Sequence, residues 1–77
     1  PIRITLEKGG STYPDNPHEG EEFGYVLSGS ICLILGNRII RVRKGESFYF
    51  TANTTHYIRA SETTGATLIW VSTPPSF

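Results

Sequence analysis

Short runs of β-prone residues alternate with turn residues along the whole chain, and this pattern restricts the fold more than any other feature of the sequence. No window holds a sustained helical period with start and stop signals. Short, evenly spaced strands are typical of a β-sandwich or a β-barrel. The runs that we expect to form strands are residues 2–6, 22–28, 31–35, 38–42, 47–51, 56–60 and 67–73.

The chain has 77 residues, which is enough for one domain with a thin hydrophobic core. Its single cysteine, Cys32, excludes an internal disulfide as a source of stability. A sheet that closes on itself is another source, because closure pairs the strand edges around one core. The sequence therefore predicts one all-β domain over residues 1–77, folded as a jelly roll or a small antiparallel β-barrel.

Glycines mark the expected turns. Gly36 and Asn37 separate two apolar runs by two residues, which indicates a tight hairpin because both residue types tolerate a positive φ. Gly29 and Gly45 also lie between runs, and we expect both in tight connections that require a positive φ. We therefore assign both of these glycines a structural role.

The charge balance bears on the kind of partner. Acidic and basic residues number seven each, so the net charge is zero with the histidines neutral. Binding to DNA phosphates normally needs a cationic excess on one face of a protein. We therefore do not expect this chain itself to contact DNA.

Several features bear on location. No signal peptide is visible, and no apolar run approaches the roughly 20 residues needed to cross a bilayer. A single cysteine fits a reducing compartment. We expect a cytoplasmic protein that does not bind membranes. Because the chain starts at Pro1 and contains no methionine, we also expect it to be a piece of a longer protein.

Three residues carry the chemistry that a site requires. His18 and Glu22 differ by four positions, so on a regular strand they point to the same face, although Gly20 between them permits a bend. His56 begins a run far along the chain, and a rolled-up sheet can bring it opposite the first pair. Two imidazoles and one carboxylate around an open position hold iron in non-haem oxygenases and also suit other divalent ions. The alternative is a metal-free pocket in which the three side chains bind one another, water or a ligand.

Aromatic residues on the expected strands pack in the core by default. The mouth of a small barrel can nevertheless hold one ligand between aromatic and polar groups. For such a lining we select Tyr49, Tyr57 and Trp70. No residue is assigned a catalytic role.

The same residues resemble the first of two motifs of the cupin superfamily, in which a His-x-His pair is followed by a glutamate and a glycine. His18 stands at the second histidine, Glu22 at the glutamate and Gly29 at the closing glycine. Asn16 stands at the first histidine, where its amide oxygen offers only a weak fourth ligand. The resemblance implies a site for a divalent transition metal such as zinc, iron, manganese or nickel.

The second cupin motif is matched in part. Gly45 and His56 stand at its first glycine and its histidine, whereas Thr51, Asn53 and Ala60 replace its proline, second glycine and asparagine. The resemblance covers nearly the whole chain and implies the cupin jelly roll, with His56 as the second histidine of the site.

The stretch from His18 to Gly29, together with residues 45–50, looks most like one group of cupins. These are the C-terminal domains of bacterial transcription regulators that carry a helix-turn-helix of the lambda-repressor type at their N-terminus. The resemblance implies a sensor of a small-molecule effector, which we expect to be a homodimer and not an enzyme. DNA would be contacted only by a domain upstream of Pro1.

Two other functions stay open at this point. The first is a metal-dependent cupin enzyme, such as a small dioxygenase or isomerase, in which His18, Glu22 and His56 hold the metal. The second is a binding module with neither a metal nor a regulatory role.

Overall fold

The computed structural model describes residues 2–73, and every regular element in that range is a β-strand. The strands are β1 (Ile2–Leu6), β2 (Glu21–Leu35), β3 (Arg38–Arg43), β4 (Ser47–Thr51), β5 (His56–Ala60) and β6 (Ala66–Thr73). Their pairings are antiparallel, which confirms the predicted all-β fold. None of the described residues forms a helix with the length and apolar character that a membrane crossing requires. Pro1, upstream of which we expect a further domain, lies outside the described residues.

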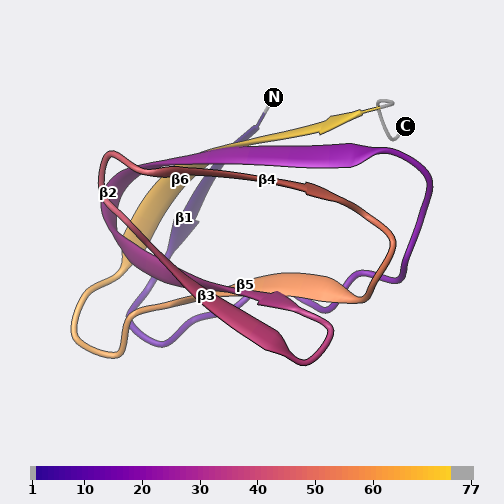
Figure 1. Ribbon diagram of the computed structural model, residues 1–77. Coiled ribbons are helices and arrows are strands. Elements are labelled where there is room, and N and C mark those ends of the chain that lie inside the picture. Colours follow the sequence, from indigo (N-terminus) through magenta and orange to yellow (C-terminus); the bar gives the residue numbers. More distant parts are fainter. Residues whose placement is uncertain (1, 74–77) are drawn as a thin grey trace.

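Strand β2 joins the two layers of the fold. Its first half lies between β4 and β6, and β1 extends this layer beside β6. Its second half lies between β3 and β5 and forms the opposite layer. Figure 1 shows β2 passing along one layer, curving, and returning in the other. One continuous strand therefore holds both layers together.

The curve in β2 corrects the prediction of a tight connection at Gly29. The strand is continuous over 15 residues, and antiparallel pairs continue on both sides of the glycine. A bulge between Val26 and Ser28 shifts the register with β6, and Gly29 adopts a φ of 71°. A β-carbon at Gly29 would lie 1.9 Å from the carbonyl oxygen of Gly65. Glycine here bends the strand instead of ending it, because only glycine combines this φ with so close an approach.

The two other turn signals lie between strands. Gly36 and Asn37 form the two-residue hairpin between β2 and β3, as predicted, with Leu35 opposite Arg38. Of the two hairpin residues, Gly36 alone has a positive φ, of 60°. Gly45 lies in the turn between β3 and β4 with a φ of 84°.

The hydrophobic core lies between the layers. Before the bulge in β2, Glu22 and Val26 face inward, and after it Ile31 and Leu33 do so. Because side chains alternate with a period of two, the extra residue of the bulge keeps the apolar side chains of both halves directed at the core. The largest fully buried apolar side chains are those of Ile31, Leu33, Ile58, Leu68 and Val26.

Residues 7–20, which we call the strap, connect β1 to β2 and run back along β5. The backbone N–H of Asp15 donates to the carbonyl of His56 at 2.8 Å, and the N–H of His56 donates to the carbonyl of Asp15 at 3.1 Å. Further along, the N–H of His18 donates to the carbonyl of Ala52 at 2.8 Å. The strap thus holds Asp15 beside the start of β5 and His18 beside the end of β4.

Candidate functional site

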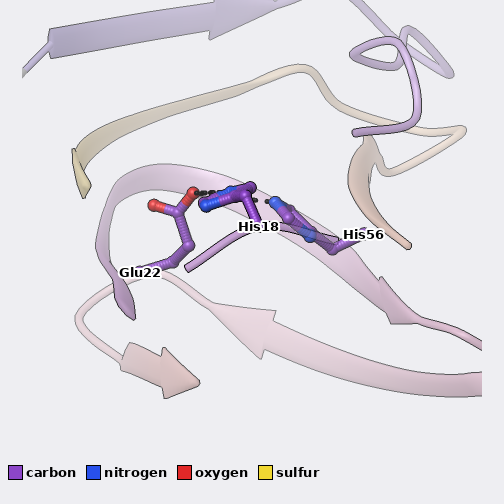
Figure 2. Close-up of side chains that lie close together, drawn as sticks. All are labelled: His18, Glu22 and His56. Carbon is purple, nitrogen blue, oxygen red and sulfur yellow. Dashed lines mark ion pairs between the residues drawn. The ribbon is translucent and has the colours of Figure 1, made fainter. Parts of the chain in front are cut away.

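The structure brings together His18, Glu22 and His56, the three residues that the sequence singled out (Figure 2). The Nε2 atoms of His18 and His56 lie 3.5 and 3.6 Å from the same oxygen, Oε1 of Glu22. The Glu22 side chain is 3% exposed and that of His56 is fully buried, whereas that of His18, on the strap, is 42% exposed. One nitrogen or oxygen atom from each residue lies within 4.8 Å of the other two.

Both imidazoles present the same ring nitrogen to this cluster. Nδ1 of His18 lies 2.9 Å from the carbonyl oxygen of Glu19, and Nδ1 of His56 lies 2.9 Å from that of Thr54. Because a carbonyl oxygen only accepts, each Nδ1 donates its proton, and Nε2 of the neutral ring keeps its lone pair. Hydrogen bonds of this kind orient histidines that bind metals. Two Nε2 lone pairs are therefore available beside Glu22.

The carboxylate of Glu22 is held by two donors on β6. Its Oε2 accepts a hydrogen bond from the indole N–H of Trp70 at 2.9 Å and another from the hydroxyl of Ser72. These bonds leave Oε1 directed at the histidines. The ring of Phe50 packs edge-on to His56 at 5.2 Å between centroids and limits the rotation of that imidazole. Two of the three side chains are thus preorganised by their neighbours.

The arrangement suits a divalent metal better than a network of direct hydrogen bonds. The separations of 3.5 and 3.6 Å are too long for nitrogen–oxygen hydrogen bonds. Nε2 of His56 is buried and has no hydrogen-bond partner within residues 2–73. Ligand atoms that surround one zinc ion tetrahedrally at about 2.1 Å lie about 3.4 Å apart. Two of the three separations between donor atoms therefore match those around one divalent ion, and the third is within 4.8 Å.

A second carboxylate, which sequence reasoning missed, lies beside His56. Oδ2 of Asp15 is 3.6 Å from Nε2 of His56. Asn16, expected as the weak fourth ligand, is exposed and is not among the residues that line the adjacent cavity. The sequence did contain a signal for Asp15, because this residue lies one position before Asn16, which replaces the first histidine of the motif. Neighbouring residues on a strand face opposite sides, so a shift of one position changes which side chain reaches the site.

A cavity of about 170 Å³ opens beside the cluster. Glu22 and His56 lie in its wall, together with Tyr57 and Trp70, two of the aromatic residues selected from the sequence. The rest of the lining consists of Ile2, Ile4, Thr12, Asp15 and Ser72. The cavity therefore joins an apolar wall to carboxylate, imidazole and hydroxyl groups.

The third selected aromatic residue, Tyr49, lies elsewhere. It is 62% exposed on the outer face of β4, where its hydroxyl donates to the carboxylate of Glu21. This hydrogen bond, followed by desolvation and the negative charge of Glu21, raises the pKa of Tyr49. Phe48 and Phe50, which alternate with Tyr49, take the inward face of β4. Tyr49, which we expected to contact a ligand, therefore does not line this cavity.

Solved structures with the same fold come from several bacteria. A protein of Bacillus halodurans has a TM-score of 0.87 and 16% identity, with 97% of this chain and 61% of that one covered. An RmlC-like cupin of Shewanella frigidimarina has a TM-score of 0.79 and 25% identity, with 95% and 63% covered. An HTH_3 family transcriptional regulator of Vibrio cholerae has a TM-score of 0.81 and 22% identity, with 96% and 42% covered. The chain thus spans less than two thirds of each of these proteins.

No curated protein matches the sequence. The family comparison, in contrast, agrees with the structural matches. The family described as "Cupin domain" matches residues 2–72, which include the strap, the three clustered residues and most of β6. The chain therefore belongs to the cupin domain family.

Proposed function

We propose that this chain is the small-molecule-sensing domain of a bacterial helix-turn-helix regulator and that it holds a divalent transition metal through His18, Glu22 and His56. The observation that carries the metal site is the approach of two Nε2 lone pairs to one carboxylate oxygen beside a cavity. With both rings neutral, these electron-rich atoms repel one another, and a cation between them removes that repulsion. A bound zinc, iron, manganese or nickel ion supplies that charge and an open position for a ligand.

The cavity limits the size of the effector. Its volume of about 170 Å³ is below the roughly 300–1,000 Å³ of pockets for drug-sized ligands. Trp70 and Tyr57 supply aromatic contacts, and Thr12 supplies a hydroxyl from the strap. An effector that touches both the strap and β6 favours the arrangement in which these elements lie close together. It shifts that equilibrium only by its difference in affinity for the two arrangements.

The regulatory role is supported by the likeness to the Vibrio cholerae regulator, of which this chain spans 42%. We propose that residues 1–77 form the C-terminal domain of such a protein and that a domain outside this chain contacts DNA. The zero net charge of this chain is consistent with that division of roles. The cytoplasmic location expected from the sequence stays a prediction.

A second copy of this chain is the partner that we propose, and its contact surface is the outer face of β2 and β4. Four large apolar side chains there are 38–62% exposed. They are Phe23, Tyr25, Leu27 and Tyr49. Contiguous exposed apolar surface of this kind marks protein interfaces.

The charges on this face favour a symmetric pair. Glu21 on β2 and Arg3 on β1 lie in different rows of the same outer face. A two-fold axis lying between two stacked copies can place each glutamate against the arginine of the other copy. Replacing both Phe23 and Tyr25 by serine should therefore produce monomers in sedimentation velocity. The control Ile39→Ser, at a residue 67% exposed on β3, should sediment like the wild type.

The metal is tested by elemental analysis of protein purified after supplementation with each of the four metals. We expect about one metal ion per chain in the wild type and none in His56→Ala. The control Tyr57→Phe removes only a hydroxyl beside the site and should retain the metal. Wild-type protein that stays free of metal after every supplementation contradicts the metal site.

A metal-dependent enzyme, such as a small dioxygenase or isomerase, is the second candidate. Asp15 favours it, because an exposed carboxylate in the cavity wall can accept a proton from a bound molecule. A thermal-shift screen of small metabolites on metal-loaded protein should find a ligand that raises the melting temperature. Mass spectrometry of that ligand after incubation separates the candidates: recovery unchanged supports the sensor, and conversion supports the enzyme.

A further inference from the structure

We propose that Asp15 is a fourth metal ligand, so that two imidazoles and two carboxylates form the site. This inference rests on the proposed metal site and deepens it. It differs from the expectation drawn from sequence, in which Asn16 supplies the weak fourth ligand.

The backbone fixes the position of Asp15 relative to His56. The two residues exchange both of their backbone hydrogen bonds, at 2.8 and 3.1 Å, as an isolated antiparallel bridge. Side chains of residues paired directly in this way lie on the same face of the sheet. The carboxylate of Asp15 is thereby directed to the side on which the His56 imidazole lies.

Nε2 of His56 is the atom that both carboxylates share. Oδ2 of Asp15 and Oε1 of Glu22 each lie 3.6 Å from it. That nitrogen is buried and unpartnered within the described part of the chain, and in the neutral ring it has no proton to donate. This nitrogen and the two carboxylate oxygens all carry lone pairs and no proton. They therefore surround one small space that suits a proton or a metal ion.

The two halves of this site differ in exposure. Glu22 and His56 are buried, whereas the side chains of Asp15 and His18 on the strap are 66% and 42% exposed. Asp15 is not within 4.8 Å of all three clustered residues. It reaches a shared ion through a change of side-chain torsion, which its exposure permits at small cost. Metal binding would then fix the side chain of Asp15, whose backbone is already paired with His56 of β5.

The second carboxylate changes the charge of the site and the ions that it prefers. Two carboxylates balance the charge of a divalent cation, whereas Glu22 alone leaves one positive charge. Carboxylate oxygens suit manganese better than imidazole nitrogens do, and imidazole suits nickel and copper. Asp15 therefore favours Mn²⁺ relative to Ni²⁺, compared with a site that holds a third histidine.

Isothermal titration of metal-free protein with Mn²⁺ and Ni²⁺ tests this inference. We expect Asp15→Asn to weaken Mn²⁺ binding by at least about 10-fold, because outer-shell changes alone often cost about 10–100-fold. Asn16→Ala is the matched control, since it alters the neighbouring exposed residue, and it should leave the affinity within about twofold. Asp15→His should restore binding and raise the ratio of Ni²⁺ to Mn²⁺ affinity.

The outcomes separate this inference from the proposed function. Wild-type protein that binds neither of these ions, nor zinc or iron, contradicts the metal site itself, whereas protein that binds only zinc or iron overturns the preference assigned to Asp15. Equal Mn²⁺ affinities of the wild type and Asp15→Asn overturn the role of Asp15 and leave the three-residue site intact. Weakening by Asn16→Ala alone assigns the fourth ligand to the amide instead. Circular dichroism of each metal-free variant verifies folding, and Asp15→Ser provides a second variant should Asp15→Asn fail to fold.

Discussion

The two halves of β2 belong to the same strand but do different work. The first half lies between β4 and β6, carries Glu22 inward to the site and exposes Phe23 and Tyr25 on its outer face. The second half lies between β3 and β5 and carries Ile31 and Leu33 into the core. Its inward residues are apolar, and it contributes no side chain to the cluster or to the cavity beside it.

This difference separates stability from chemistry within one element. A buried charge needs partners, and Glu22 finds them in Trp70 and Ser72 on the neighbouring β6. Leu33 needs only close packing, which β3 and β5 provide from either side. Changes in the second half should therefore affect folding, and changes in the first half should affect binding.

The largest effect should come from Gly29→Ala, at the point where the two halves meet. The positive φ costs about 1–3 kcal/mol for a residue with a side chain, and overpacking against Gly65 adds about 1–3 kcal/mol. We expect the free energy of unfolding in urea to fall by about 2–6 kcal/mol. Gly45→Ala is the control: its φ is 84° but no atom lies within 4 Å of a β-carbon there, so a loss of only about 1–2 kcal/mol is expected. Equal losses in both variants would show that the approach to Gly65 does not matter.

Leu33→Ala should destabilise the second half of β2 without affecting metal binding. The side chain is 1% exposed, and truncation of a buried leucine costs about 2–5 kcal/mol. Chemical denaturation measures the loss, and titration below the unfolding transition should give the wild-type metal affinity. The control Ile39→Ala, at a residue 67% exposed on β3, should cost less than about 1 kcal/mol. Loss of metal affinity in folded Leu33→Ala would contradict the separation of the two halves.

Glu22→Gln should do the opposite of Leu33→Ala: it should weaken metal binding and change the stability of the metal-free protein little. The amide keeps the shape of the side chain but loses the charge that attracts a cation, so metal affinity should fall by at least about 100-fold, or about 2.7 kcal/mol. The melting temperature of metal-free protein should change much less. Glu21→Gln, which alters the adjacent outward-facing carboxylate, should bind metal like the wild type. A comparable loss in both variants would point to a general effect of negative charge.

Cys32→Ser should have the smallest effect. Cys32 is half-buried on the outer side of the second half of β2, between Arg41 and Arg59 in the register. We expect a change of less than about 1 kcal/mol in stability and none in metal affinity. A loss of metal affinity in this variant would indicate that the thiol contributes to the metal site, which would contradict the separate roles of the two halves of β2.

The sequence predicted most of the strands and the residues of the cluster, because both depend on local patterns. Alternation marks a strand, and Gly36-Asn37 marks a hairpin, whatever lies on either side. His18 and Glu22 could be selected because their spacing would place them on one face of a regular strand, although His18 lies on the strap before β2 begins. His56 could be selected because a rolled sheet can return to them. The site then follows from two imidazoles and a carboxylate in a small all-β chain.

Other features could not be read from spacing. The continuity of β2 through Gly29 depends on β6, which pairs with both sides of the bulge. The outward position of Tyr49 depends on which face of β4 meets the core, a choice made by Phe48 and Phe50. The proximity of Asp15 to His56 depends on the register of the strap against β5.

The sequence by itself determined that this chain forms short strands around a thin core and which side chains have the chemistry to bind a cation. Only the tertiary structure decided which of those side chains meet and which way each ring nitrogen and carboxylate oxygen points. Strand propensity acts over neighbouring residues, so a single sequence encodes it directly. The register between strands depends on contacts between residues far apart in the chain, and a shift of one position exchanges the side chain that faces the site for its neighbour.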